Sequence, residues 1–187
     1  MQRGYSLLEL VIVMAVAGIL ATVAVPAAKP LVDKTRANSA INDLAHAIAL
    51  ARSAALTYQR PVTLCPGISN ACGARNSWAD GMLVFTDDDG DQRLDEDELI
   101  IARIPGTTHG RFRWRSFRNR SELLFTAYGL TDWLNGSFLY CPDDNDSRQA
   151  RMLIINTAGR TRHAQDRNRD GIREDSSGRP LNCSTSG

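Results

Sequence analysis

The stretch Gly4-Tyr5-Ser6-Leu7-Leu8-Glu9 is followed at once by an uncharged apolar run from Leu10 to Ala28. At a rise of about 1.5 Å per residue, a helix over residues 5–28 is roughly 35 Å long, which is enough to cross the ~30 Å hydrocarbon core of a bilayer. A carboxylate inside an apolar span is costly unless it has a partner. The stretch therefore predicts a helix embedded in a membrane or an assembly, with a specific role for Glu9.

The order of features differs from that of a secretory signal peptide. Such a peptide places its basic residues first, then its apolar core, and then a small-residue cleavage site. Here Arg3 and the small Gly4 both precede the apolar run. Cleavage after Gly4 would therefore leave the hydrophobic segment on the mature chain.

This arrangement resembles the class III leader of type IV prepilins and pseudopilins, through Gly4, the aromatic Tyr5, Glu9 and Pro26. The resemblance implies that a prepilin peptidase in the membrane cuts after Gly4 and methylates the new N-terminus at Tyr5, where the family usually has Phe. It also implies that Glu9 pairs with the N-terminal amine of a neighbouring subunit. The alternative is an ordinary signal anchor, in which Glu9 would have no partner in hydrocarbon.

Composition agrees with an anchored domain in an oxidising compartment. The net charge of +1 favours no class of partner. Four cysteines, none in a zinc-finger spacing, are typical of proteins outside the cytosol. Together with the leader, they predict a single-pass protein of the bacterial inner membrane with a periplasmic domain, which reaches the pilus filament or cell surface after assembly.

Helical periodicity continues beyond the apolar run. Apolar residues recur at three- and four-residue steps at Ile41, Leu44, Ile48, Ala51 and Ala55, so one long helix is expected from about Tyr5 to Thr57. Short apolar segments separated by Gly, Pro and Asp then predict strands. These are Val62–Cys65, Met82–Thr86, Leu99–Ile104, Phe112–Arg115, Leu123–Thr126, Phe138–Cys141 and Met152–Asn156. A long helix followed by short strands predicts an α+β fold.

Three segments resemble the GspH/FimT group of minor pilins and pseudopilins, namely Ala51–Ala55, Trp78–Asp87 and Ile154–Arg160. The resemblance implies a type IV pilin-like fold, in which the long helix packs on small antiparallel sheets. It also implies other major and minor pilins as partners. The expected division is a leader (1–4), an assembly and transmembrane helix half (5–28), an α+β domain (29–162) and a polar tail (163–187).

Four cysteines allow three pairings. Locality favours Cys65–Cys72, which closes a short loop, and Cys141–Cys183, which ties the polar tail back to a strand. Both would stabilise the fold and neither requires a redox role.

A basic tetrapeptide near the end of the domain is the main candidate for nucleic-acid binding. Gly159-Arg160-Thr161-Arg162 matches the GRxR motif through which FimT-like minor pilins bind DNA during natural transformation. The resemblance implies that Gly159, Arg160 and Arg162 bind double-stranded DNA without sequence preference. Arg148 and Arg151 are expected to widen this patch.

A second basic stretch alternates with aromatic residues. On a strand, Arg111-Phe112-Arg113-Trp114-Arg115 places Phe112 and Trp114 toward the core and the arginines on the opposite face. Arg113 and Arg115 are therefore additional DNA-binding candidates. A solvated strand face without a partner is the alternative.

No catalytic constellation is present in the sequence, so the chain is not expected to be an enzyme. The alternative to a DNA-binding minor pilin is a GspH-like minor pseudopilin of a type II secretion system, which would bind protein partners only.

Two acidic loops raise the question of calcium. Asp87, Asp89, Asp91 and Glu98 occupy places one, three, five and twelve of an EF-hand-like loop, but Gln92 stands where the turn needs glycine. The second loop matches better, with Asp166, Asn168, Asp170 and Glu174. The same residue types also form turns without any ion. No obligatory cofactor is expected, and calcium is a candidate ligand of the second loop.

Overall fold

The structure is a computed structural model that describes residues 7–117 and 119–184, apart from the side chains of residues 23–27. The chain divides into two units, residues 1–35 and 36–187, and each is described by itself. The long helix α1 (Leu7–Tyr58) contributes to both units.

The described part of the first unit is helical, as predicted. Its large apolar side chains between Leu7 and Leu20 are exposed in the single chain, and Glu9 lies in the first turn of α1. The sequence predicts a membrane span over residues 5–28, whereas no helix in the part of the chain that the structure describes is both long and apolar enough to cross a membrane. Gly4 and Tyr5 lie outside the described residues.

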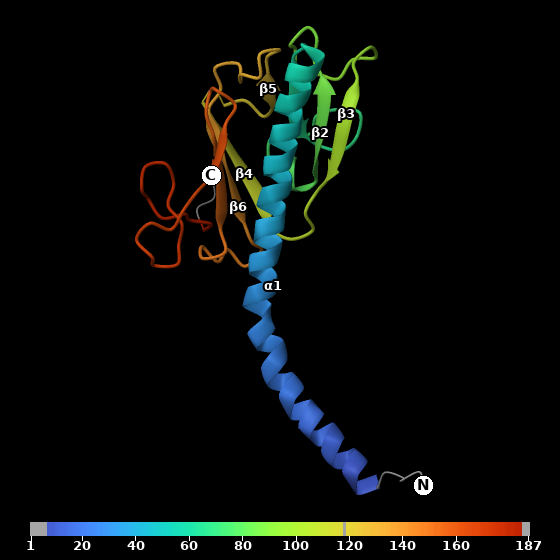
Figure 1. Cartoon of the computed structure of the whole chain (residues 1–187), viewed down its shortest axis with the longest axis vertical. Coiled ribbons are helices and arrows are strands. Elements are labelled where there is room, and N and C mark those ends of the chain that lie inside the picture. The colour runs from blue at the N-terminus through green and yellow to red at the C-terminus, as the bar shows by residue number, and fades with distance from the viewer. Residues whose placement is uncertain (1–6, 118, 185–187) are drawn as a thin grey trace. The chain divides into compact units, whose positions relative to one another are not determined.

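The second unit combines the C-terminal part of α1 with two sheets (Figure 1). A 3-10 helix η1 (Ser77–Ala79) precedes the second strand. The strands are β1 (Val62–Pro66), β2 (Gly81–Thr86), β3 (Ile100–Pro105), β4 (Arg111–Ser116), β5 (Leu123–Phe125), β6 (Gly136–Cys141), β7 (Arg151–Ile155) and β8 (Thr161–His163). Sheet A has the order β3-β2-β1-β5 and sheet B the order β4-β6-β7-β8, and every pairing is antiparallel. The predicted α+β fold of a long helix packed on small antiparallel sheets is confirmed.

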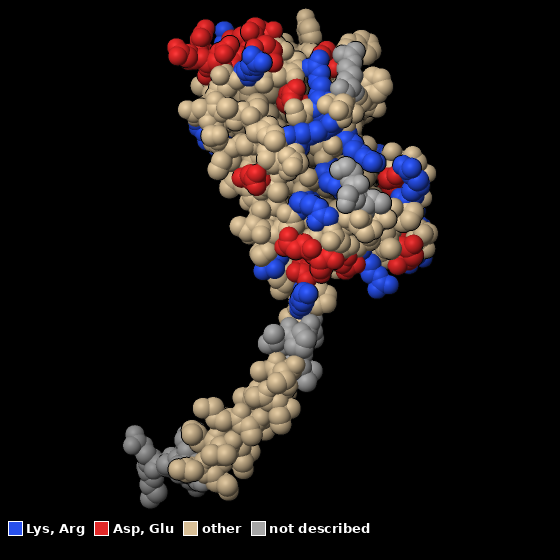
Figure 2. All heavy atoms as spheres, turned by 180° about the vertical axis from the view of Figure 1, so that it is seen from behind, with Lys and Arg blue, Asp and Glu red and all other residues tan. Residues whose placement is uncertain are grey.

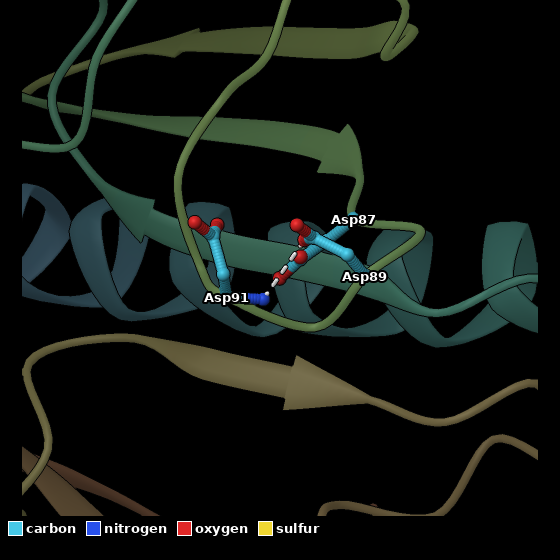
Figure 3. A group of neighbouring side chains, drawn as sticks. All are labelled: Asp87, Asp89 and Asp91. Carbon is cyan, nitrogen blue, oxygen red and sulfur yellow. Dashed lines mark hydrogen bonds between the residues drawn. The ribbon is translucent and has the colours of Figure 1, made fainter.

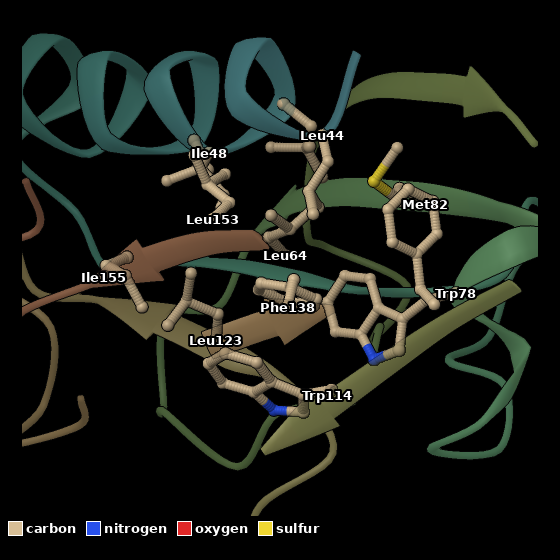
Figure 4. Close-up of a cluster of buried hydrophobic side chains, with 14 of the residues drawn as sticks. Leu44, Ile48, Leu64, Trp78, Met82, Trp114, Leu123, Phe138, Leu153 and Ile155 are labelled. Carbon is tan, nitrogen blue, oxygen red and sulfur yellow. The ribbon is translucent and has the colours of Figure 1, made fainter. Parts of the chain in front are cut away.

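One alanine-rich face of α1 is buried in this unit. Its members recur at three- and four-residue steps, and they are Ala37, Ala40, Ile41, Leu44, Ala47, Ile48, Ala51, Ala54 and Ala55. The stripe predicted from the sequence is therefore confirmed. Figure 4 shows Leu44 and Ile48 pointing from the helix toward side chains of both sheets. The helix ends at Tyr58, because Gln59 adopts a left-handed φ of 53° and Pro61 follows two residues later.

Both sheets contribute side chains to one core (Figure 4). The indole of Trp114 stacks on the ring of Phe138 with centroids 4.0 Å apart, and Trp78 meets Phe138 edge-on at 4.7 Å. Fully burying a side chain the size of Phe contributes about 1.5–3 kcal/mol. The aromatic cluster therefore fixes η1 and sheet B together.

All seven predicted strands are present, with ends that differ by one or two residues. The sequence did not predict η1 or the short, polar β8. The structure contains both predicted disulfides, Cys65–Cys72 and Cys141–Cys183. The second joins residues 42 positions apart. In the chain-entropy description such a loop contributes about 4 kcal/mol.

The fragment 36–187 is expected to fold without residues 1–35, because the buried hydrophobic residues belong to the second unit. Urea unfolding of the oxidised fragment, followed by circular dichroism, should show one cooperative transition. Reduction should lower its free energy of unfolding by about 4 kcal/mol or more, since both loops gain freedom in the unfolded chain. An oxidised fragment that remains unfolded would mean that residues 1–35 are needed for the core.

Candidate functional site

The tetrapeptide Gly159–Arg162 lies in the hairpin that joins β7 to β8. The amide of Gly159 donates to the carbonyl of Asn156 at 2.9 Å, and the amide of Asn156 donates to the carbonyl of Arg160 at 3.1 Å. Gly159 has a φ of +69°. This pattern is a three-residue hairpin loop that closes with a residue in the left-handed region, where glycine is favoured.

Close packing is a second reason for glycine at this place. A Cβ atom on Gly159 would lie 2.8 Å from the carbonyl oxygen of Gly129 and 3.2 Å from Cδ of Arg52. The amide of Thr131 also donates to the carbonyl of Thr157 at 3.1 Å. The hairpin is therefore held against the turn at 126–131 and the last turns of α1. Gly159 shapes this support and contributes no side chain of its own.

The two arginines of the motif are exposed at the edge of sheet B. Arg160 ends the loop and Arg162 lies on the edge strand β8, so the two side chains share one face of the strand. The register places Arg162 opposite Ile154, Ile154 opposite Ser137, and Ser137 opposite Arg115. Phe138 beside this row points to the core, so the row lies on the outer face of the sheet.

This row connects the two basic stretches of the sequence, Arg111–Arg115 and Gly159–Arg162. Arg115 and Arg162 are three strand spacings apart, which corresponds to about 14 Å. Figure 2 shows basic side chains gathered on one face of the second unit, with groups of acidic side chains above and below them.

Arg151 does not lie on this surface, and its predicted role in widening the patch is wrong. Its side chain is 4% exposed. Its Nε donates to Oδ1 of Asn38 on α1 at 2.8 Å, and its Nη1 donates to the carbonyl of Ala150 at 2.9 Å. Burial, with the neighbouring charge of Arg173, lowers the pKa of Arg151 to about 10. Side chains two positions apart on a strand share a face, so Arg151 faces the helix as the core residues Leu153 and Ile155 do.

Arg148 is exposed, but it precedes β7 and so lies at the opposite end of that strand from the hairpin. Its neighbours in the loop include Asp144 and Asp146. The amide of Arg148 donates to Oδ1 of Asp146 at 3.0 Å. Arg148 therefore does not extend the surface formed by Arg160 and Arg162.

Arg113 and Arg111 hold the C-terminal tail. Nη2 of Arg113 donates to the carbonyl of Asn182, and Nη2 of Arg111 donates to the carbonyl of Cys183 at 3.1 Å. Partial burial lowers the pKa of Arg113, and the charges of Arg111 and Arg115 act in the same direction. One donor of Arg113 is therefore used within the protein, and its contact with phosphate stays a prediction. Arg115 is exposed and remains a candidate.

Two exposed aromatic residues lie in or beside the turn at 126–131 that contacts the hairpin, and the sequence pattern did not predict them. Tyr128 is 82% exposed and precedes Gly129, the residue that contacts the hairpin. Trp133 is 75% exposed and has a φ of +52°, which is unusual for a large side chain. Aromatic residues in short turns give no periodic signal, so only their place beside the hairpin identifies them.

The first acidic loop follows β2 and carries Asp87, Asp89 and Asp91 (Figure 3). Asp87 is buried, and burial raises its pKa, while hydrogen bonds from the Thr63 hydroxyl and the Gln92 amide act against this rise. Both carboxylate oxygens of Glu98 accept backbone amides, from Asp88 and Asp95. Hydrogen bonds within the protein therefore organise this loop.

The second acidic loop lies in the tail. Carboxylate oxygens of Asp166, Asp170 and Glu174 lie within 4.8 Å of one another. Asn168, between the first two, is exposed, and its Oδ1 accepts the amide of Asp170 at 3.0 Å. The structure thus brings together the residues that the sequence predicts for calcium.

Comparisons with known proteins agree with this architecture. Residues 40–159 match the family described as Type II transport protein GspH, and residues 1–25 match the prokaryotic N-terminal methylation motif. A search of curated proteins finds no match. Two crystal forms of the type IV minor pilin FimU from Pseudomonas aeruginosa share the fold. They are 19% and 21% identical to this chain, cover 78% of it and 96% and 98% of their own chains, and both give a TM-score of 0.51.

The fold and the N-terminal motif define a pilin-like structural subunit and not an enzyme. The chain belongs to the GspH family and is a minor pilin or pseudopilin. Membership implies other pilin-like subunits as partners and processing at the N-terminal motif.

Replacing Arg151 should affect stability and not the surface. Arg151→Gln should lower the free energy of unfolding by about 1–3 kcal/mol, because it leaves the side-chain oxygen of Asn38 and the carbonyl of Ala150 without their donor. Arg162→Gln is the control and should stay within about 0.5 kcal/mol of the parent. Urea unfolding measures both. Equal stability of the two variants would contradict the buried role of Arg151.

Proposed function

We propose that this chain is a minor type IV pilin that binds double-stranded DNA through the β7–β8 hairpin. The observation that supports the proposal is the exposure of Arg160 and Arg162 on one face of a hairpin that is fixed by hydrogen bonds and close packing. A backbone held in this way needs little ordering when DNA binds, and the planar guanidinium groups match the geometry of phosphate oxygens. The function that follows is DNA capture for natural transformation.

The row on the outer face of sheet B consists of Arg162, Ile154, Ser137 and Arg115, and its length matches a groove of double-stranded DNA. Arg162 and Arg115 are about 14 Å apart along the row, close to the ~12 Å width of the major groove of B-DNA. Side chains at this spacing are able to reach phosphates on both sides of that groove. The residues between them, Ser137 and Ile154, carry no charge and do not repel the backbone.

Binding should be weak and should not depend on sequence. The proposed contacts are few, and arginines on a sheet edge reach phosphates and not base edges. The described helix of the second unit turns its apolar face to the core. Non-specific complexes of this kind have dissociation constants of about 10⁻⁶–10⁻⁴ M.

The first acidic loop should restrict the side from which DNA approaches the hairpin. Eight of the twelve residues from Asp87 to Glu98 are acidic. This loop follows β2. The end of β2 is two strands away from Phe125 of β5, which lies beside the hairpin. Since surface charges act over about 8 Å at physiological ionic strength, DNA near this loop would be repelled. The part of the outer face of sheet B around Arg115, Arg160 and Arg162 is the favoured approach.

The N-terminal segment would bring the domain into a filament. In this proposal a prepilin peptidase cuts after Gly4, Tyr5 becomes the methylated N-terminus, and the inner membrane holds the helix half 5–28 before assembly, with the domain in the periplasm. Glu9 would then pair with the free amine of a neighbouring pilin. The match of residues 1–25 to the methylation motif supports this route.

A minor pseudopilin of a type II secretion system is the second candidate, and the family description over residues 40–159 favours it. Such a subunit contacts proteins and has no need of phosphate contacts. Measured DNA binding separates the two candidates.

Arg160→Gln combined with Arg162→Gln should weaken binding of fragment 36–187 to a labelled duplex at least tenfold at about 50 mM salt. Each lost phosphate contact also removes one unit from the salt dependence, so the slope of log affinity against log salt should become about two units less negative. Parent binding should itself fall roughly tenfold between about 50 and 200 mM salt if two phosphates are contacted. Fluorescence anisotropy at several salt concentrations measures both quantities.

The matched control is Arg60→Gln with Arg93→Gln. It removes two exposed arginines that lie in or beside the first acidic loop. The change in net charge is the same, so affinity should stay within about threefold of the parent if the hairpin carries the contacts. Arg115→Gln should give a smaller loss than the hairpin variant. If the hairpin variant binds as well as the parent, the GRxR assignment is wrong and a purely structural subunit remains.

A further inference from the structure

We propose that the loop from Asp166 to Glu174 in the tail binds one calcium ion. The ligands would be the side-chain oxygens of Asp166, Asn168, Asp170 and Glu174, with a backbone carbonyl and water completing the shell. The proposal is independent of DNA binding, because it concerns a different loop and a different ligand.

The buried carboxylate of Glu174 is the observation that points to a ligand. Glu174 is 7% exposed, and its Oε1 is buried with no hydrogen-bond partner in the described part of the chain. The other oxygen, Oε2, accepts the amide of Arg167 at 2.8 Å. A buried polar atom without a partner is costly and uncommon in a native protein. A cation bound at Oε1 would remove this cost.

The surrounding carboxylates are close enough to share that cation. One oxygen each of Asp166, Asp170 and Glu174 lies within 4.8 Å of the other two. Calcium binds oxygen at about 2.3–2.6 Å, so two oxygens of the same shell lie at most about 4.6–5.2 Å apart. The three groups therefore fit a single calcium ion.

The order of residues is that of a shortened calcium loop. Asp166, Asn168 and Asp170 take places one, three and five, and Gly171 takes place six with a φ of +90°. The amide of Gly171 donates to Oδ2 of Asp166 at 2.9 Å. Glu174 stands at place nine, earlier than the glutamate at place twelve of a full EF-hand.

The first acidic loop does not carry the same proposal. Its buried member, Asp87, accepts hydrogen bonds from the Thr63 hydroxyl and the Gln92 amide. Gln92 occupies the sixth place of that loop with a φ of +67°, although it has a side chain. No buried oxygen of Asp87 or Glu98 among the described atoms is left without a partner. Among the described acidic loops, the unpartnered buried oxygen belongs to the tail loop.

Affinity should be modest. Three carboxylates supply the charge, while Arg167, Arg169 and Arg173 lie in the same loop and oppose a cation. Calcium sites of extracellular modules bind with dissociation constants of about 10⁻⁴–10⁻³ M, and the same range is expected here.

Calcium would stabilise the part of the tail that covers sheet B. The amide of Glu174 donates to the carbonyl of Gln165, and the amide of Leu181 donates to the carbonyl of Arg173. Leu181 and Cys183 pack with Met152 in a small second core. The ion would therefore fix both ends of the loop against that core.

Calorimetric titration of the full chain in detergent, together with hydrogen exchange followed by mass spectrometry, tests the proposal. Calcium chloride should give one site with a dissociation constant of about 0.1–1 mM and should slow amide exchange in residues 165–182 but not in 87–98. Magnesium chloride should bind at least tenfold more weakly. Glu174→Gln and, separately, the exposed Asp170→Asn should each remove the heat and the protection.

Asp89→Asn is the matched control, because it removes one carboxylate from the other acidic loop, and it should bind calcium as the parent does. Absence of heat and protection in the parent would overturn the proposal. Binding that is retained in Asp170→Asn but lost in Asp89→Asn would also overturn it, as would equal binding of magnesium.

Discussion

Burial of the alanine-rich face of α1 is the interaction on which the rest of the domain depends. Both sheets are short, and the smaller clusters on their outer faces contain only six and three buried residues. The main core cluster contains residues of α1, sheet A and sheet B together. Alanines along the stripe allow close approach, while Leu44 and Ile48 fill the space behind them. The two sheets are joined through this contact.

The hairpin at Gly159 shows how that dependence reaches the candidate site. Arg52 comes from the same helix, and its Nε donates to the carbonyl of Gly129 at 3.0 Å. The same carbonyl is the closest neighbour of the position that a Cβ on Gly159 would occupy. Helix, turn and hairpin thus form one contact, so the core fixes the place from which Arg160 extends.

Local patterns in the sequence predicted most of the fold. The buried stripe of α1 follows from its three- and four-residue spacing, the strands follow from apolar segments between turn residues, and the disulfide pairing follows from locality. The strand β8 was missed, because three polar residues at an edge carry no hydrophobic signal.

The arginines were harder to predict, because their partners are distant in sequence. Arg151 bonds to Asn38, 113 residues earlier, and Arg113 bonds to Asn182, 69 residues later. An arginine in a basic stretch suggests a surface, and only the tertiary structure shows which guanidinium groups serve the fold. Of the seven residues predicted to bind DNA, Arg162 and Arg115 lie exposed at the two ends of the row, Arg160 is exposed beside Arg162, and Gly159 shapes the turn.

Basic side chains gather on one face of the second unit, between groups of acidic side chains (Figure 2). Chemical-shift mapping of isotope-labelled fragment 36–187, titrated with a short DNA duplex, tests most directly whether the hairpin meets the DNA. The largest shifts should occur at Arg160–Arg162, with smaller shifts at Arg115 and none in residues 87–98. Shifts centred elsewhere, or none at saturating DNA, would mean that the hairpin does not bind DNA.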